Sequence, residues 1–304
     1  MDFNKIQAFF AVIEHHNLSN AAHALRVSQP TLSRQMQALE HEFNASLFER
    51  GKRGMVPTEA GKRLYEGLQA LERHIHALKG EVAAASVEPS GEVTFGIPPS
   101  PRTLLAVPLL KQFATDYPRV AVRIVEETSG ELRDLVASGV LDLAVTNFSE
   151  PIRNVSAEPL GCEQMLLVGP PEAGLSMKNP IAIDDLIKLP LILTTRPNSL
   201  RMTIEAGLSR SGRHPNVRIE ANALPLMTDL VTAGLGYTVL PLCGVRAILR
   251  SKRVTACPIR DFRITWVLAR TKSRPLNLAA KRFSDLLQQF SRKMIAQQIW
   301  SEPD

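Results

Sequence analysis

The apolar residues that open the chain recur every three or four positions, the spacing that places side chains on one face of a helix. An opening helix of about three turns is therefore predicted. Ser19 is the expected N-cap of a short second helix. Ser28 is the expected N-cap of a third helix, from about Gln29 to Phe43, because Pro30 falls in its first turn. The apolar residues of the first helix are Phe3, Ile6, Phe9, Phe10 and Ile13, and the second contains Ala21, Ala22 and Leu25.

The predicted third helix has one apolar stripe and one polar face, which is typical of a helix packed on a small core. Two short helices joined by a tight turn, the second with an outward polar face, describe a helix-turn-helix. A small helical domain with a merely solvated polar face is the alternative. The stripe comprises Leu32, Met36, Leu39 and Phe43, and the opposite face carries Pro30, Arg34, Gln37 and His41.

The segment from Leu47 to Val56 is a basic stretch punctuated by two glycines, which predicts a hairpin of the kind that forms a wing. Arg50, Lys52 and Arg53 lie at its tip, where they could reach phosphates or the minor groove. The hairpin therefore favours DNA binding over the solvated helical domain.

These motifs together resemble the N-terminal domain of LysR-type transcriptional regulators. The resemblance extends over about sixty residues in order and in register, which makes it more specific than a generic helix-turn-helix. The matching residues are Ala21-Ala22 with Leu25, Ser28-Gln29-Pro30-Thr31-Leu32-Ser33, Leu39-Glu40, Leu47-Phe48-Glu49-Arg50 and Pro57-Thr58-Glu59-Ala60-Gly61.

By this resemblance, Gln29, Pro30, Ser33 and Arg34 belong to the recognition helix, and Arg50 and Arg53 belong to the wing. Gln29 is placed to contact a base edge or a phosphate, and Arg34 to contact a guanine or a phosphate oxygen. The sequence does not choose between those contacts. The predicted DNA-binding residues are Ser28, Gln29, Pro30, Thr31, Ser33, Arg34, Gln37, Arg50, Lys52 and Arg53.

Thr58 is the expected cap of a further helix, in which apolar residues alternate spacings of four and three. Such a seam indicates either a helix that pairs with a second copy or an amphipathic core helix. The family resemblance implies dimerisation, and two recognition helices related by a two-fold axis would bind an interrupted palindrome. The seam residues are Leu64, Leu68, Leu71, Ile75, Leu78 and Val82.

A small, polar stretch ending in Pro89-Ser90-Gly91 marks a domain boundary near residue 90. Beyond it, apolar strands alternate with helical segments in two sets, which predicts βαβ units, a parallel sheet and two subdomains. This part resembles the effector domain of the same family, whose fold is similar to periplasmic solute-binding proteins. The expected strands lie near residues 93–97, 120–125, 141–145, 164–168, 190–193, 217–220, 237–240 and 265–269.

The predicted fold class is therefore multidomain, with an all-α winged helix-turn-helix, a long linker helix and an α/β periplasmic-binding-protein-like domain. The effector domain is divided into subdomain I, about residues 91–162 and 268–304, and subdomain II, about residues 163–267. The other expected domains are 1–57 for DNA binding, 58–90 for the linker helix and hinge, and 91–304 for effector binding.

In open α/β sheets, ligands bind at the carboxyl ends of strands, near helix N-termini that attract anions. This rule selects hydroxyl and amide groups suited to a small anionic effector, with Arg196 and Arg201 placed to pair with a carboxylate. The same Ser and Thr side chains could instead only cap helices. The run Thr195–Arg201 is similar to family members that control nitrogen assimilation. The predicted effector-binding residues are Ser100, Thr103, Thr128, Ser129, Asn147, Phe148, Thr195, Arg196, Asn198, Ser199 and Arg201.

Composition is that of a globular protein, with 44% hydrophobic and 22% charged residues in a chain of 304. The net charge of +6 suggests a nucleic-acid partner only superficially. The first 90 residues hold 10 basic and 10 acidic side chains, whereas residues 244–304 hold 13 basic against 4 acidic. The DNA-binding interpretation therefore rests on where a few arginines lie. We interpret the C-terminal excess as an aid to solubility, with a second DNA contact as the alternative.

No catalytic constellation, metal cluster or phosphate cradle has a recognisable spacing, so we expect neither an enzyme nor a cofactor. Cys162, Cys243 and Cys257 fit neither a disulfide framework nor a zinc site, and oxidant sensing is a minor alternative. The longest charge-free stretch, Leu230 to Val245, is too short to span a bilayer, and the start lacks signal-peptide features. A cytoplasmic protein without a membrane partner is expected.

The expected function is sequence-specific transcriptional regulation controlled by a small effector bound between two α/β subdomains. The expected partners are double-stranded DNA with an interrupted palindrome, further copies of the chain as a dimer and a tetramer, the effector, and RNA polymerase. The alternative is a solute-binding protein with a helical dimerisation segment and no role on DNA.

Overall fold

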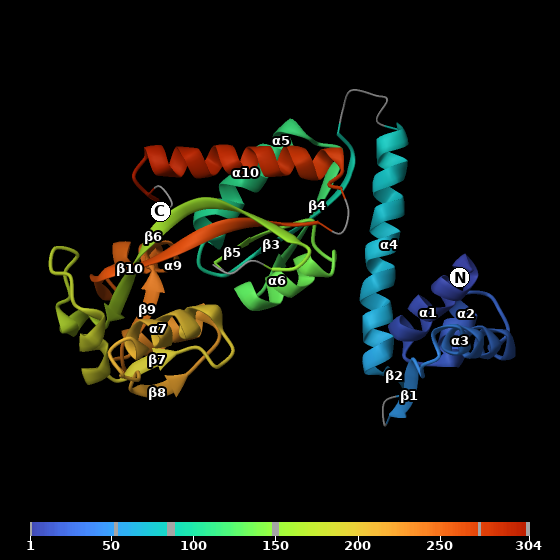
Figure 1. Ribbon diagram of the computed structural model, residues 1–304, viewed down its shortest axis with the longest axis horizontal. Coiled ribbons are helices and arrows are strands. Elements are labelled where there is room, and N and C mark those ends of the chain that lie inside the picture. The colour runs from blue at the N-terminus through green and yellow to red at the C-terminus, as the bar shows by residue number, and fades with distance from the viewer. Residues whose placement is uncertain (1, 52–53, 84–88, 148–151, 273–274, 302–304) are drawn as a thin grey trace. The chain divides into compact units, whose positions relative to one another are not determined.

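The structure, a computed structural model, divides into two compact units, Met1–His76 and Ala77–Asp304 (Figure 1). Each unit has its own hydrophobic core and is described separately. Among the described residues, no helix is long and apolar enough to cross a membrane. The described residues are 2–51, 54–83, 89–147, 152–272 and 275–301.

The first unit is a three-helix domain followed by a two-stranded hairpin and the start of a long helix. Ser28 caps α3 by accepting a hydrogen bond from Thr31 N, so the predicted third helix is confirmed at both ends. The predicted cap of α2 is wrong: Asn17 caps the helix by accepting from Ser19 N at 2.7 Å, and Ser19 lies inside it. The elements are α1 (Phe3–His15), α2 (Leu18–Ala24), α3 (Gln29–Phe43), β1 (Phe48–Gly51), β2 (Gly54–Pro57) and α4 (Glu59–Ala83).

The stripe of α3 is buried as predicted for Leu32, Met36 and Leu39, which pack with Phe9 of α1 in one cluster. Phe43, predicted on the same stripe, is 43% exposed because the helix ends there and Asn44 turns into the left-handed region. At the hairpin, Gly54 has a φ of +107°, and a Cβ added there would collide with His16 O. The turn therefore needs glycine.

Thr58 caps α4 as predicted, because its Oγ1 accepts from Gly61 N at 3.1 Å. Two of the predicted seam residues, Leu64 and Leu68, pack on the core of the same chain. Leu71 is 39% exposed and Ile75 is half-buried. The side chains of Leu78 and Val82 lie outside the described residues.

The second unit is built on a six-stranded mixed sheet in the order β4-β3-β5-β10-β6-β9. The prediction of a parallel sheet is wrong in part. β3 runs parallel to β4 and β5, but β10 is antiparallel to both β5 and β6, and β9 is antiparallel to β6. The elements of this sheet are β3 (Gly91–Ile97), β4 (Val120–Glu126), β5 (Leu143–Thr146), β6 (Val155–Gly169), β9 (Thr238–Pro241) and β10 (Thr255–Thr271).

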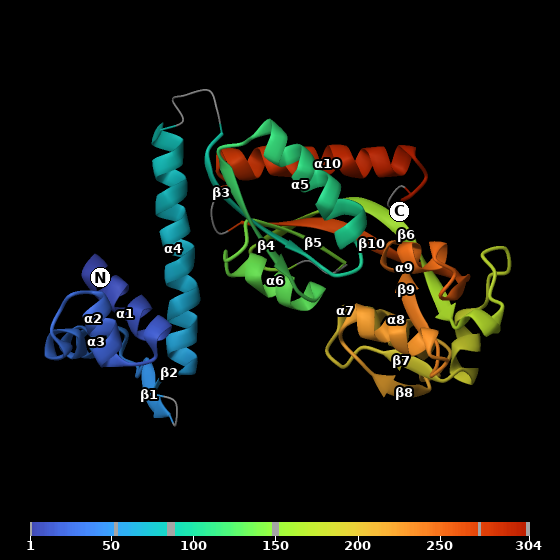
Figure 2. The same ribbon diagram turned by 180° about the vertical axis from the view of Figure 1, so that it is seen from behind.

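Helices cover both faces of the β3-β4-β5 part of the sheet (Figure 1, Figure 2). On one face, Phe95 of β3 packs against Phe283 of α10 (Leu278–Ala296), which also contacts Phe113 of α5 (Val107–Asp116). On the other face, α6 (Ser129–Ala137) buries Leu132 and Val136 in a separate cluster. A short helical segment, η1 (Arg102–Ala106), leads into α5. These elements form subdomain I.

Subdomain II surrounds the other end of the sheet. Its strands β7 (Leu191–Leu193) and β8 (Val217–Glu220) are parallel, and β7 lies beside Tyr237 at the start of β9. The helix α9 was not predicted: the expected strand near residues 237–240 ends before it, and no element was assigned to the residues that follow. The helices of this subdomain are α7 (Ser199–Ser209), α8 (Leu224–Thr232) and α9 (Leu242–Arg250), and short helical segments are η2 (Pro171–Ala173) and η3 (Ile183–Lys188).

The long strands β6 and β10 pass through both subdomains as one antiparallel ladder. The ladder shifts register between Pro258 and Arg263 and again between Trp266 and Val267. Close to the second shift, Cys162 and Ser301 exchange two backbone hydrogen bonds of 2.9 Å each. The segment after α10 is therefore attached to the crossing strand β6.

Candidate DNA interface and effector pocket

The polar face of α3 is open to solvent. Gln29, Arg34 and Gln37 are exposed, and Ser33 is half-buried. Pro30 and Thr31 are also exposed at the start of the helix. The predicted recognition residues therefore lie together on one accessible surface, at and after the N-terminus of α3.

Hydrogen bonds restrict what some of these side chains can contact. The hydroxyls of Ser28 and Thr31 lie 2.7 Å apart, and Ser28 is also engaged as the helix cap. Ser19 donates to Oε1 of Gln29 at 3.2 Å, which directs the amide nitrogen of Gln29 away from α2. The Gln29 amide nitrogen, held in this orientation, can donate to a phosphate oxygen or to an acceptor on a base edge.

The hairpin is held by Glu40 of α3, whose Oε1 accepts from Leu47 N at 2.8 Å and from Phe48 N at 3.4 Å. A side chain of the predicted recognition helix therefore positions the hairpin β1-β2 directly. Lys52 and Arg53 lie outside the described residues, and so does the side chain of Arg50.

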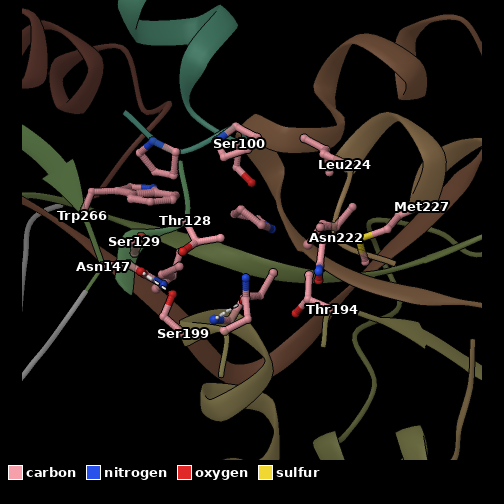
Figure 3. Close-up of a pocket in the computed structure, with 17 residues that line it drawn as sticks. Ser100, Thr128, Ser129, Asn147, Thr194, Ser199, Asn222, Leu224, Met227 and Trp266 are labelled. Carbon is pink, nitrogen blue, oxygen red and sulfur yellow. Dashed lines mark hydrogen bonds between the residues drawn. The ribbon is translucent and has the colours of Figure 1, made fainter. Parts of the chain in front are cut away.

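The second unit contains a pocket of about 560 Å³ between its two subdomains (Figure 3). Thr128, Ser129 and Asn147 lie on one side and Asn222, Leu224 and Met227 on the opposite side. This inner pocket is lined by Pro98, Pro99, Ser100, Thr128, Ser129, Asn147, Thr194, Asn198, Ser199, Leu200, Asn222, Leu224, Met227, Leu240, Pro241, Ile264 and Trp266.

Among the described residues, no acidic or basic side chain lines the inner pocket. Its polar groups are hydroxyls and amides at the carboxyl ends of strands, and α6, α7 and α8 begin at its wall. Helix N-termini carry partial positive charge, so they favour a negative group without a charged side chain. The remaining surface is apolar, including Trp266, Leu224 and Met227. The pocket therefore suits a small molecule with an apolar body and one polar or anionic end.

One hydrogen bond crosses the pocket from one subdomain to the other. Ser199 Oγ, at the start of α7, donates to Asn147 Oδ1, after β5, at 2.9 Å (Figure 3). Both residues line the inner pocket and also an outer cleft of about 2100 Å³ that opens from it. This hydrogen bond therefore lies where the inner pocket meets the outer cleft.

The structure brings six of the eleven predicted effector residues together in the inner pocket: Ser100, Thr128, Ser129, Asn147, Asn198 and Ser199. Thr195 and Arg196 line only the outer cleft. Thr103 and Arg201 line neither space, and Thr103 is exposed on η1. Phe148 lies outside the described residues.

The two arginines predicted to pair with a carboxylate are both engaged by Glu205. Arg201 is 8% exposed and lies 2.5 Å from Glu205, and Arg196 lies 2.8 Å from it. Burial raises the pKa of Glu205, but hydrogen bonds from Arg196 and Arg201 outweigh burial and hold it below its usual value. Arg201, in the first turn of α7, therefore pairs with Glu205 of the same helix and stabilises α7.

The wall of the outer cleft is acidic. Glu126, Glu127, Glu131 and Asp134 line it, against Arg133 and Arg196. Burial and the neighbouring carboxylate of Glu131 raise the pKa of Glu127. The Thr128 hydroxyl holds the pKa of Glu131 low as part of a capping box. Attraction of an anion must therefore come from the inner pocket.

Sequence reasoning missed much of the apolar wall. Asn222 follows the carboxyl end of β8, so the rule applied to the other strands would have identified it. Trp266 lies within the crossing strand β10, and no spacing in the sequence distinguishes it from a core residue. The missed lining residues are Asn222, Leu224, Met227, Leu240, Pro241, Ile264 and Trp266, whereas Pro98, Pro99, Thr194 and Leu200 lie in strand-end segments that the same rule selects, 98–103 and 194–201.

Two family models match the chain. Residues 3–62 match the bacterial regulatory helix-turn-helix protein of the lysR family, and residues 86–292 match the LysR substrate binding domain. The chain belongs to the LysR family. A LysR-type regulator has a helix-turn-helix DNA-binding domain and an effector-binding domain, and the two units correspond to this arrangement.

Named relatives and solved structures agree with this assignment. The LysR-family chain is 28% identical to the nitrogen assimilation regulatory protein nac of Escherichia coli, covering 82% of this chain and 81% of nac. It is 28% identical to the transcriptional regulator BbuR of Bordetella bronchiseptica, covering 99% and 93%. A structure of full-length CbnR with its target DNA has a TM-score of 0.70 at 22% identity, covering 95% of this chain and all of CbnR. That structure supports the fold.

Proposed function

We propose that this LysR-type regulator binds an interrupted palindrome as a dimer, with α3 in the major groove and the hairpin on the backbone or minor groove. The observation that carries the proposal is the exposed face of α3, where Gln29, Arg34 and Gln37 stand above a buried stripe. Arg50, Lys52 and Arg53 are assigned to the hairpin contact on sequence grounds. Because its target is the genome, the protein acts in the bacterial cytoplasm.

The dimer is formed through the α4 seam. Leu64 and Leu68 pack into the core of the winged domain. The part of the seam that begins at Leu71 is therefore the part that pairs with a second copy. An exposed leucine that continues a heptad spacing is suited to a second copy of the same helix. Pairing of two such dimers into a tetramer, and contact with RNA polymerase, follow from the family resemblance.

The effector is a small molecule with an apolar body and a carboxylate or similar anionic end. Three helix N-termini and a ring of hydroxyl and amide groups support the anionic end, and Trp266, Leu224 and Met227 support the apolar body. Ser100, Thr128, Ser129, Asn147, Asn198 and Ser199 are the effector residues we retain, and Thr195 and Arg196 line its path.

Effector binding and DNA binding are coupled because the effector favours one arrangement of the two subdomains. A change in how the subdomains pack in the oligomer alters the spacing of the paired winged helices on DNA. The effector must therefore have different affinities for the two arrangements. Unchanged footprint length and unchanged DNA bend with every ligand that binds would contradict this mechanism.

Genome-wide footprinting of the bound protein is the experiment that tests the function. Discrete sites with two half-sites related by a palindrome are expected, and genes next to them would indicate the pathway and hence the effector. Binding spread uniformly over the genome, or none at all, would overturn the proposal.

A charge series tests the chemistry of the effector. Benzoate, benzamide and benzylamine share a ring and differ in charge, so the rise in melting temperature of the second unit compares their end groups directly. Stabilisation by benzoate and by neither of the others is expected. Preferential stabilisation by benzylamine would indicate that the acidic outer cleft, and not the helix N-termini, selects the effector.

A further inference from the structure

A buried carboxylate lies behind Trp266 in the wall of the inner pocket, on the crossing strand β6. Glu163 is 3% exposed. The other charged side chains that are buried among the described residues, Asp142 and Arg201, are held by Thr94 and by Glu205 respectively. Glu163 has no ion pair in the described part of the chain, and Arg246 acts on it only through its charge. Burying such a group costs stability unless hydrogen bonds compensate.

Both oxygens of Glu163 accept hydrogen bonds from groups that can only donate. Cys243 N donates to Oε1 at 2.6 Å, and the indole Nε1 of Trp266 donates to Oε2 at 3.0 Å. Burial is the largest influence and raises the pKa of Glu163 above its usual value, although hydrogen bonds from Cys243 and Trp266 and the charge of Arg246 act in the opposite direction. An ionised carboxylate can accept at both oxygens, but a carboxamide of the same shape presents one acceptor and one donor.

The two donors belong to different elements, β10 and α9. Trp266 forms part of the pocket wall. Cys243 lies in the first turn of α9, and a Cβ added at the next residue, Gly244, would lie 3.2 Å from Ser100 Oγ. Ser100 follows β3 in subdomain I and lines the pocket. The carboxylate therefore fixes the indole and the place where α9 meets the other subdomain.

We propose that Glu163 is a positioning residue for effector binding, which orients the Trp266 indole in the pocket wall and holds the start of α9 against Ser100. This inference rests on the proposed effector role of the pocket. An apolar residue would fill the same volume without the cost of a buried charge. The contribution of the carboxylate is therefore the orientation of its two donors, which sets the shape of the pocket across both subdomains.

The chain supplies its own spectroscopic probe, because Trp266 and Trp300 are its only tryptophans. The indole N–H of Trp300 is buried with no hydrogen-bond partner among the described residues, whereas that of Trp266 donates to a carboxylate. With 15N-labelled tryptophan in the full-length protein, we expect one strongly deshielded, slowly exchanging indole proton. Its absence from Trp300→Phe samples would contradict the assignment, and its absence from Trp266→Phe samples would support it.

In Glu163→Gln, we expect the deshielded Trp266 signal to disappear. Exchange of this indole proton with solvent should accelerate by about tenfold, as for the loss of a hydrogen bond. Glu158→Gln is the matched control, because Glu158 lies on the same strand and accepts from Arg270 and Gln288 outside the pocket. A Trp266 signal that is unaffected by Glu163→Gln, or equally affected by Glu158→Gln, would overturn the proposal.

Acrylamide quenching in the Trp300→Phe background gives a second measure. Glu163→Gln should increase quenching of Trp266, because the indole is no longer held in the wall, and unchanged quenching would overturn the proposal. Footprinting of the parent protein without added ligand separates this inference from the proposed function. If the parent gave no footprint, the proposed regulatory function would fail, whereas the indole data would still decide the role of Glu163.

Discussion

Arg34 is an exposed side chain on the polar face of α3, and its contact with DNA determines what its removal changes. If Arg34 contacts a base, Arg34→Ala should weaken operator binding by about 1–3 kcal/mol and relax the preference at one position. Fluorescence anisotropy with the operator and single-base variants measures both effects. Arg282→Ala, which removes an exposed charge from α10, serves as the control. Unchanged affinity and preference would remove Arg34 from the interface.

Lys52 gives a contrasting prediction, because we assign it to the phosphate backbone. Lys52→Ala should weaken binding to all sequences alike. It should also reduce the slope of the logarithm of the binding constant against the logarithm of salt concentration by about one. Titrations at several salt concentrations check this. A loss confined to the operator would show that Lys52 discriminates between bases.

At the residue scale, the sequence predicted polar groups better than apolar ones. Asn147 and Ser199 line the inner pocket and were predicted as effector residues, because hydroxyl and amide side chains at the carboxyl ends of strands follow a topological rule. Trp266 was missed because its pocket contact depends on the register of β10 against β6. Arg201 was misjudged because its partner, Glu205, lies one helical turn away, and the spacing alone does not favour this pair over a bound ligand.

Among the elements, α4 provides a test of dimerisation. Leu71→Glu should convert the dimer to monomers, because it places a charge on the exposed part of the seam, and sedimentation velocity would detect the change. Lys62→Glu reverses a charge on the same helix away from the seam and should leave the dimer intact. A dimer that survives Leu71→Glu would assign pairing to another surface.

Helix α7 provides a prediction on pH. The pKa of Glu205 lies below its ordinary value of 4.5, so its contribution to stability is present above pH 4.5 and is lost as the pH falls through the lowered value. Glu205→Gln should lower the free energy of unfolding at neutral pH by about 3–5 kcal/mol, the cost of removing one partner of a buried pair. It should also reduce the sensitivity to acid.

Melting temperatures between pH 3 and neutral pH would measure both effects of Glu205→Gln. Glu172→Gln, at an exposed carboxylate of the same unit, should change neither. Equal acid sensitivity in Glu205→Gln and the parent would show that the ion pair with Arg201 contributes little.

At the level of elements, local signals predicted the helices of the first unit well. Pro30 and Ser28 define the start of α3 through chemistry within one turn. The sheet of the second unit was harder because β6 and β10 carry charged residues, such as Glu163 and Arg263, within strands of 15 and 17 residues. Only their apolar stretches were identified, and the direction of pairing depends on contacts between residues about a hundred positions apart.

For the whole molecule, separate cores predict separate unfolding transitions. Leu39 is fully buried in the first unit, so Leu39→Ala should destabilise that unit by about 2–5 kcal/mol. Differential scanning calorimetry should show one transition moving and the other unchanged. Leu143→Ala, at an equally buried leucine of β5, should move the other transition. A single transition that shifts in both variants would show that the units unfold together.

At the scale of the whole molecule, the structure shows where the basic residues lie. Much of the C-terminal excess lies on the outer surface of the second unit, with Arg282 and Lys293 exposed on α10 and Arg253 paired with Asp229. Net charge alone would have directed attention to the wrong unit for DNA binding. The face of α3 was identified from the order of its residues, which a composition does not contain.

The hydrogen bond between Ser199 and Asn147 has a kinetic consequence. It joins two side chains that line both the inner pocket and the outer cleft, so an effector that accepts a hydrogen bond from the Ser199 hydroxyl has to replace it. Binding then includes a step in which this hydrogen bond breaks, and the association rate falls below the limit set by diffusion. The same barrier slows escape, so the regulator would keep responding for some time after its effector has become scarce.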